Sequence, residues 1–294
     1  MRVNPNPYPD VLAALNQTRQ DQQEALLQLS SGRRVNRPSD DPAAAAVLVQ
    51  NRDQASFNTR YLANLESLQG QFQTADSAMN SVVLALQRAV TLGVEGANGT
   101  LSDQDRAAIT GELQGIQDQL LSLANTSFQG RYLFSGTVIA TPPFAKDNTV
   151  ASGVRYDGNN AINTVQIGDG YRMAANQPGS LLFVAPGHDV FQTMTDLIQA
   201  MQSNTGFTTA IASVRDSLDH LSGQRVFYGN AMNQGQSQSN YLGTAKLQLS
   251  QQENTLAGAD IEAAASHLVN AQNSTNATLA ALGRISQLSL FDFL

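Results

Sequence analysis

An uninterrupted apolar repeat between residues 61 and 89 constrains the fold of this chain more than any other feature. Its members alternate in steps of four and three: Tyr61, Leu65, Leu68, Phe72, Ala75, Met79, Val82, Leu86 and Ala89. This spacing places them all on one face of an α-helix. A continuous helix from Asp41 to Leu92 would be about 75 Å long, because each residue adds about 1.5 Å. The repeat therefore predicts a rod of packed helices rather than a globule.

A shorter helix is predicted to run back along this one. Gly93, Gly96 and Gly99 interrupt the first helix. Ser102, followed three residues later by Asp105, is close to a capping box, which marks a new helix start. The new helix repeats the spacing at Ile109, Leu113, Ile116, Leu120 and Leu123. Because the connecting loop is short, we expect the two helices to be antiparallel neighbours.

The two ends of the chain carry weaker stripes. A predicted helix from about Pro9 to Ser31 has its stripe at Leu12, Leu15, Leu26 and Leu29, with Arg19 and Gln22 at the intervening positions. The C-terminal stripe comprises Ile261, Ala264, Leu268, Ala271, Thr275, Thr278, Leu282 and Ile285. Steps of three and four residues are typical of a coiled-coil seam, in which the faces of two helices interlock.

Polar residues dilute both terminal stripes. A seam of this kind is marginal in an isolated chain and becomes stable when neighbouring chains pack around it. We therefore interpret both ends as assembly elements. The side chains expected to drive the assembly are Leu12, Leu15, Leu26, Leu29, Ile261, Leu268, Leu282 and Ile285.

A basic linker joins the first two predicted helices. Gly32 ends the first helix, and residues 33–38 include three arginines. Residues 39–42 have the composition of a helix start, with the Ser39 hydroxyl as the cap and Pro42 in the first turn. The carboxylates of Asp40 and Asp41 are expected to stabilise the positive end of the helix dipole rather than to form a catalytic pair.

The pattern changes between residues 132 and 187. Helical spacing stops, and turn signals separate three short predicted strands: residues 153–156, 164–167 and 171–173. Residues 168–170, Gly-Asp-Gly, lack the sequence context of a nucleotide site, so we interpret them as a hairpin turn. Helical spacing returns at Asp189. A last long helix, marked by Ile211, Val214, Leu218 and Leu221, can continue through Leu242 and Leu249 toward the C-terminal stripe.

These elements predict a mainly α fold with a small β-rich insertion. The expected architecture is a terminal coiled coil and an elongated antiparallel helical-bundle rod, folded back as a hairpin. The predicted domains are a terminal coiled coil (residues 1–42 and 255–294), a helical rod (residues 43–134 and 188–254) and an inserted domain (residues 135–187).

The composition excludes several classes of function. Only 14% of the residues are charged and the net charge is -7, whereas a surface that binds nucleic acid needs a basic stripe. No stretch of about 18 apolar residues is present, so we expect no membrane insertion. The absence of cysteine excludes disulfides and thiolate chemistry. The first residues lack the features of a secretory signal peptide, so any export is expected to use another route.

We predict no catalytic, cofactor-binding or metal-binding residues. The three histidines, His188, His220 and His267, are far apart and lack metal-ligand spacing. An enzyme within the insertion would need converging titratable groups. Those present form no recognisable arrangement: Lys146, Asp147, Arg155, Asp157, Asp169 and Arg172.

Several motifs resemble the bacterial flagellin superfamily. Residues 29–36 read Leu-Ser-Ser-Gly-Arg-Arg-Val-Asn, and residues 38–43 read Pro-Ser-Asp-Asp-Pro-Ala. Residues 86–89 and 97–103 resemble the rod region of the same family. This signature disfavours a generic secreted coiled-coil adhesin.

Other stretches resemble the hook-associated branch of the superfamily rather than the filament subunit. They are the opening residues 1–3 and residues 128–136, 165–170, 189–192 and 285–292. The resemblance covers nearly the whole chain. One departure is residues 224–230, where the family has a more regular charged helix.

The resemblance implies a structural subunit, not an enzyme, at the junction between hook and filament of the bacterial flagellum. It implies export of the unfolded chain by the flagellar type III apparatus, without a cleaved signal peptide, to an extracellular location. The implied partners are further copies in a ring, the first hook-associated junction protein, flagellin and an export chaperone that covers the C-terminal stripe. The alternative is flagellin itself, which the short insertion and the ending Leu-Phe-Asp-Phe-Leu disfavour.

Overall fold

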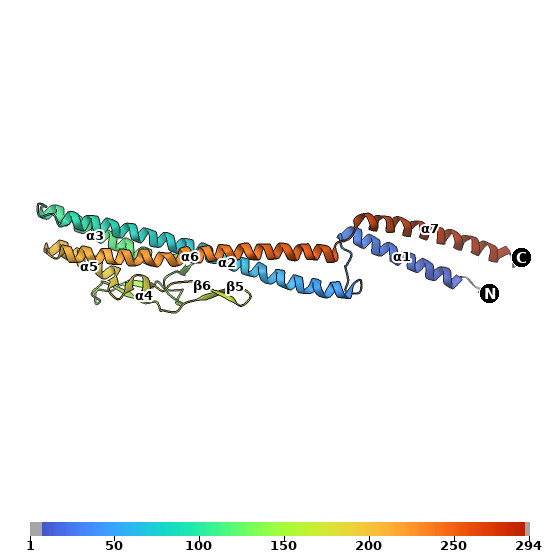
Figure 1. The fold of residues 1–294 in the computed structure, drawn as a ribbon, viewed down its shortest axis with the longest axis horizontal. Coiled ribbons are helices and arrows are strands. Elements are labelled where there is room, and N and C mark those ends of the chain that lie inside the picture. Colours follow the sequence, from blue (N-terminus) through green and yellow to red (C-terminus); the bar gives the residue numbers. More distant parts are fainter. Residues whose placement is uncertain (1–7, 292–294) are drawn as a thin grey trace. The chain divides into compact units, whose positions relative to one another are not determined.

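A computed structural model describes the backbone of residues 8–291 and the side chains of residues 9–283. Figure 1 shows the order of its elements along the chain. The described chain forms two compact units. The central unit comprises residues 58–243, and the terminal unit comprises the described residues before 58 and after 243.

The terminal unit is built on two paired helices. Helix α1 (Tyr8–Ser31) packs against α7 (Ile261–Phe291), and the two run antiparallel (Figure 1). The same unit contains the first part of α2 (Pro42–Gly96) and the last part of α6 (Phe207–Ala257).

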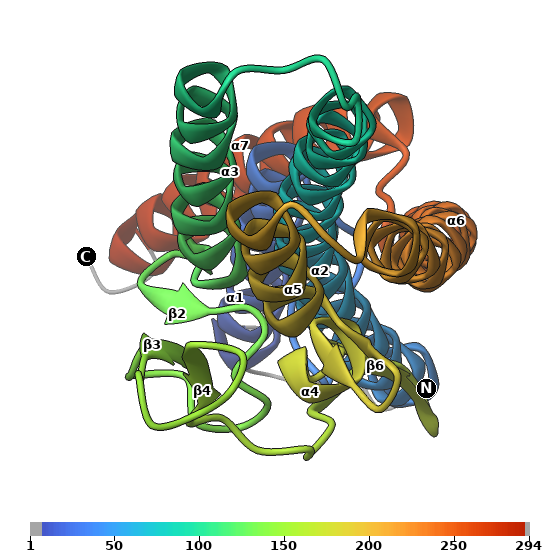
Figure 2. The same cartoon turned by 90° about the vertical axis from the view of Figure 1, so that its left-hand side faces the viewer.

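The central unit surrounds one large apolar core. The rest of α2 packs there with α6, α3 (Asp103–Ala124) and α5 (Val190–Ser203). Figure 2 shows these helices with α6 nearly end on. Every member of the predicted repeat from Leu65 to Ala89 is buried, and Tyr61 is half-buried. A helix with one wholly apolar stripe can hide it only against other helices, which is what this core provides.

Helix α3 follows the prediction closely. Its start is a capping box between Ser102 and Asp105, and α2 ends at Gly96. The guanidinium of Arg88 on α2 contacts Glu112 on α3 at 2.7 Å, whereas Arg106 near the start of α3 reaches the carbonyl of Gly96. These two contacts run in opposite order along the two helices, so the helices are antiparallel as expected.

The inserted segment is a series of hairpins, each an antiparallel sheet of two strands. The pairs are β1 (Ser127–Phe128) with β2 (Arg131–Tyr132), β3 (Phe144–Lys146) with β4 (Val154–Tyr156), β5 (Thr164–Gly168) with β6 (Tyr171–Ala174), and β7 (Val184–Ala185) with β8 (His188–Asp189). A short helix, α4 (Gly179–Leu182), precedes β7. Asp169 and Gly170 form the turn between β5 and β6, so the hairpin turn predicted at residues 168–170 is present, with Gly168 as the last residue of β5. The predicted fold class, mainly α with a small β-rich insertion, is confirmed.

Aromatic residues join the insertion to the helices of the central unit. Phe144 of β3 lies 5.5 Å from Phe183 and from Phe191, measured between ring centroids. Asp189 begins α5, because its carboxylate accepts hydrogen bonds from the amides of Phe191 and Gln192. The expected return of helical structure at Asp189 is therefore confirmed.

The segment that departs from the family pattern, residues 224–230, is a regular part of α6. Arg225 donates two hydrogen bonds to the carboxylate of Asp76 on α2, at 2.9 and 3.1 Å. Phe227 and Tyr228 pack around Phe72, the first of them edge to face. An ion pair and an aromatic cluster therefore anchor α6 to α2 at this point.

Among the described residues, no helix is both long and apolar enough to cross a bilayer.

Candidate assembly surface

The linker after α1 is paired with the break between α6 and α7. The backbone of residues 32–34 runs antiparallel to that of residues 257–259. Its hydrogen bonds are Arg34 N to Ala257 O, 2.7 Å, and Ala259 N to Gly32 O, 3.0 Å. We call residues 32–41 and 257–260 the joint. The turn between α1 and α2 is therefore hydrogen-bonded to the turn between α6 and α7.

Two glycines permit this change of direction. Gly32 has a φ of +67°, a conformation that other residues adopt only with strain. At Gly258 a Cβ would lie 2.4 Å from the carbonyl oxygen of Asn254, so a larger residue would displace the backbone. The joint therefore depends on backbone geometry that only glycine supplies without cost.

The arginines of the joint are held by specific acceptors. Arg33 contacts Glu253 at 2.5 Å, and Arg52 of α2 contacts the same carboxylate at 3.3 Å. Arg34 pairs with Asp41 at 3.1 Å. A small apolar cluster lies in the same unit and comprises Val35, Ala44, Leu48 and Ala257. The basic linker is thus an ordered structure.

The two adjacent carboxylates of the joint have separate tasks. Asp40 accepts hydrogen bonds from the amides of Asn36 and Arg37, at 3.0 and 2.7 Å, and so closes the linker loop. Asp41 accepts from the amide of Ala44 at 3.0 Å and caps α2. The prediction that the Ser39 hydroxyl is the cap is wrong, because the carboxylate of Asp41 reaches the amides of the first turn instead.

Hydrogen bonding lowers the pKa of both carboxyl groups. For Asp40 the largest cause is the hydrogen bond from the Arg37 amide, followed by that from Asn36. For Asp41 it is the hydrogen bond from the Ala44 amide, followed by the Arg34 guanidinium. Both groups stabilise the joint in their ionised form.

The α1–α7 seam is narrow and is built largely from alanines. Leu15 and Ala25 of α1 are buried, and so are Ala264 and Ala271 of α7. Of the predicted assembly residues, Leu29, Leu268 and Leu282 are half-buried in the seam. The pairing of α1 with α7 therefore buries little apolar surface within a single chain.

Other predicted assembly residues face outward. Leu12, Leu26 and Ile261 expose 42%, 57% and 50% of their surface. Sequence reasoning missed three further exposed side chains of the two helices: Leu27, Val269 and Leu279. Leu279 lies 18 residues, or five helical turns, after Ile261, so both side chains are on the same face of α7. A search of the sequence for a second apolar stripe could have found this face. Ile285 belongs to α7, but its side chain lies outside the described residues.

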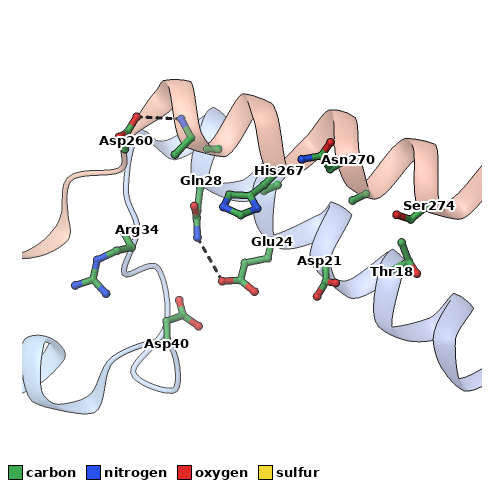
Figure 3. A pocket seen from close by; sticks show the side chains of 14 residues that line it. Thr18, Asp21, Glu24, Gln28, Arg34, Asp40, Asp260, His267, Asn270 and Ser274 are labelled. Carbon is green, nitrogen blue, oxygen red and sulfur yellow. Dashed lines mark hydrogen bonds between the residues drawn. The ribbon is translucent and has the colours of Figure 1, made fainter.

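A polar groove lies along the helix pair, as Figure 3 shows. Helix α1 and the joint contribute Thr18, Asp21, Glu24, Gln28, Arg34 and Asp40; Asp260 and α7 contribute His267, Asn270 and Ser274. Its carboxylates are bonded locally: Glu24 to the side chain of Gln28, and Asp260 to the amides of Glu262 and Ala263. Within residues 9–283, no cluster of three or more His, Asp or Glu side chains could hold a metal ion. The groove therefore presents polar and charged side chains along the surface of the helix pair.

The expectation that the three histidines are far apart is wrong for two of them. The rings of His188 and His220 are stacked, with centroids 4.8 Å apart and planes 1° from parallel. His267 lies in the groove of the terminal unit. Nothing in the local sequence pattern signals the pair, because it forms between a hairpin and a distant helix.

Comparison with known proteins supports the predicted resemblance. Residues 6–138 match the bacterial flagellin N-terminal helical region. The chain is 28% identical over 290 residues to flagellar hook-associated protein 3 of Escherichia coli, covering 90% of each chain. It is 36% identical over 157 residues to the protein of that name from Salmonella typhimurium, covering 53% of this chain and 48% of that protein.

Solved structures show the same fold. A flagellar hook-associated protein from Vibrio parahaemolyticus superposes with a TM-score of 0.60 at 24% identity, covering 75% of this chain and 97% of that one. The motifs at residues 29–43, the helical N-terminal match and the near full-length similarity to hook-associated protein 3 agree with one another. The chain belongs to the flagellin superfamily.

Proposed function

We propose that this protein is a structural subunit of the bacterial flagellum at the junction between hook and filament, assembled through its terminal helices. The observation that carries the proposal is the set of outward-facing apolar side chains on a helix pair whose own seam is narrow. The similarity to hook-associated protein 3 supports the same location. The proposed division into a terminal coiled coil, a rod and an insertion keeps the residue ranges predicted above.

Assembly would supply the burial that the single chain lacks. Burying an exposed leucine or isoleucine side chain such as Leu12, Leu26 or Ile261 contributes about 1.5–3 kcal/mol. Copies related by a rotation and a rise use two different faces, so a contact of this kind propagates from one copy to the next. Terminal helices that are weakly paired alone and stable in the assembly would limit premature polymerisation in the cell.

The proposed partners are those of a junction subunit. They are further copies of the chain in a ring, the first hook-associated junction protein on one side, flagellin on the other, and an export chaperone that covers the C-terminal stripe before export. We propose that the chain leaves the cell unfolded, through the flagellar type III apparatus and without a cleaved signal peptide. Its proposed location is extracellular.

Immunogold electron microscopy of intact flagella tests the location. An antibody raised against residues 135–187 should label a single cluster where the hook meets the filament. Gold along the whole filament would identify a flagellin instead. A strain that lacks the gene is the control for antibody specificity, and absence of label from wild-type flagella would reject both assignments.

A further inference from the structure

The stacked histidines lie where the insertion docks on a long helix of the central unit. His188 belongs to β8 and His220 to α6, and both side chains are half-buried. Their rings are parallel within 1°, with centroids 4.8 Å apart. The contact joins the β7–β8 hairpin to α6 without a covalent or ionic link.

The two rings differ in the hydrogen-bond partners of their nitrogen atoms. The Nε2 of His220 lies 2.8 Å from the carbonyl oxygen of Leu181 in α4, so it is the donor nitrogen. The Nδ1 of His188 is buried and has no hydrogen-bond partner within the described part of the chain. A neutral ring tolerates this site, whereas a proton on Nδ1 would place a donor and a positive charge there without an acceptor.

The charged groups on the elements around the pair are mostly acidic. They are Asp189 on β8, Asp196 on α5, and Arg215, Asp216, Asp219 and Arg225 within five residues of His220 on α6; α4 and β7 carry none. A proton on one imidazole charges only that ring. A second proton would put two like charges on rings whose centroids lie 4.8 Å apart.

We propose that the His188–His220 stack is an acid-sensitive latch that holds α4 and the β7–β8 hairpin against α6. At neutral pH the rings stack and the latch is closed. Acid that protonates both imidazoles separates the rings, and the hairpin loosens.

The neighbouring carboxyl group has the opposite effect. Burial raises the pKa of Asp189, and this outweighs the hydrogen bonds from the amides of Gln192 and Phe191, which lower it. A carboxyl group with a raised pKa in the folded state favours folding as the pH falls. The titration of Asp189 therefore cannot produce the acid loosening that we propose for the histidines.

Hydrogen exchange of the full-length chain tests the latch. The amide of Val190 donates to the carbonyl of Phe183 at 2.8 Å across the base of the β7–β8 hairpin, so the peptide around residues 183–191 reports loosening of the hairpin. On moving from about pH 7.5 to about pH 5.5, protection of this peptide, corrected for intrinsic exchange, should fall by at least about tenfold, while peptides of the α2 core keep theirs.

Glutamine variants separate the latch from general acid effects. His188→Gln and His220→Gln keep a polar side chain but cannot become charged, so each should abolish the pH-dependent loss of protection. His267→Gln, in the terminal unit, is the matched control and should behave like the wild type. Equal protection of the wild-type peptide at the two pH values would overturn the proposal. So would an undiminished acid loss in both His188→Gln and His220→Gln.

Discussion

At the scale of single residues, the buried Arg106 ties three segments of the central unit together. Its guanidinium donates to the carbonyls of Gly96 and Leu101 at 3.2 and 3.3 Å and to the side chain of Asn204 at 2.7 Å. Gly96 ends α2, where the helix dipole is negative and favours a cation. We expect Arg106→Met to lower the free energy of unfolding by about 2–4 kcal/mol, because buried acceptors lose charged donors.

Urea unfolding of the full-length chain measures this loss. Arg215→Met is the matched control, because Arg215 is an exposed arginine on α6 of the same unit. Its effect should stay within about 0.5 kcal/mol. Equal stability of the two variants would show that Arg106 is not a structural tie.

The carboxyl groups of the joint make a second prediction at this scale. The pKa values of Asp40 and Asp41 are lowered in the folded state from an ordinary value of 3.8. Their contribution to stability is therefore present above that ordinary value and is lost as the pH falls through the lowered one. Asp41→Asn should lower stability at neutral pH and flatten the decline in stability between about pH 5 and pH 2.

Circular dichroism during urea titrations at several pH values would follow this decline. The control is Asp53→Asn, which changes an exposed carboxylate further along α2. In this variant the free energy of unfolding should decline with falling pH as steeply as in the wild type. An acid slope in Asp41→Asn as steep as that of the wild type would contradict a capping role for Asp41.

At the scale of elements, the proposed assembly requires α7 to contact other copies of the chain. Leu282 is half-buried on α7 within the terminal unit. Leu282→Asp should leave the central unit folded but block incorporation into flagella, because a carboxylate would be buried in the assembled seam. Truncation of the same side chain to alanine should cost about 2–5 kcal/mol if assembly buries it fully.

Incorporation is measured by isolating flagella from a strain that expresses only the variant. Val226→Asp, at an exposed position of α6 in the central unit, controls for the effect of an added charge. Recovery of Leu282→Asp in assembled flagella at the wild-type level would refute the assembly role of α7.

Elements with a strong local signal are the ones that sequence reasoning predicts. The unbroken repeat along α2 and the capping box of α3 are local patterns, and they predict the course of α2 and the start of α3 at Ser102. Strands of two residues, such as β7 and β8, show no period and were missed. The pairing of the linker with Gly258 and the stack of His188 on His220 join residues that are far apart in the sequence, so no local pattern could reveal them.

At the scale of the whole molecule, the two compact units differ in how much apolar surface they bury. The central unit encloses a large core with fully buried aromatic residues, including Phe72 and Phe191, whereas the α1–α7 seam relies on Leu15 and alanines. Local unfolding is easiest where few apolar contacts hold the chain. We expect trypsin to cut the purified monomer first at terminal sites such as Arg19, leaving a resistant fragment that contains residues 58–243.

Mass spectrometry of a timed digest identifies the cut sites, and assembled flagella provide the comparison. In the assembly, packing with neighbouring copies should protect Arg19, because cleavage requires the helix to open locally. The central unit should be equally resistant in both states, which makes it the internal control. If the monomer kept intact termini while its central unit was cut, the narrow seam would be stable by itself. Assembly would then not be needed to order the terminal helices.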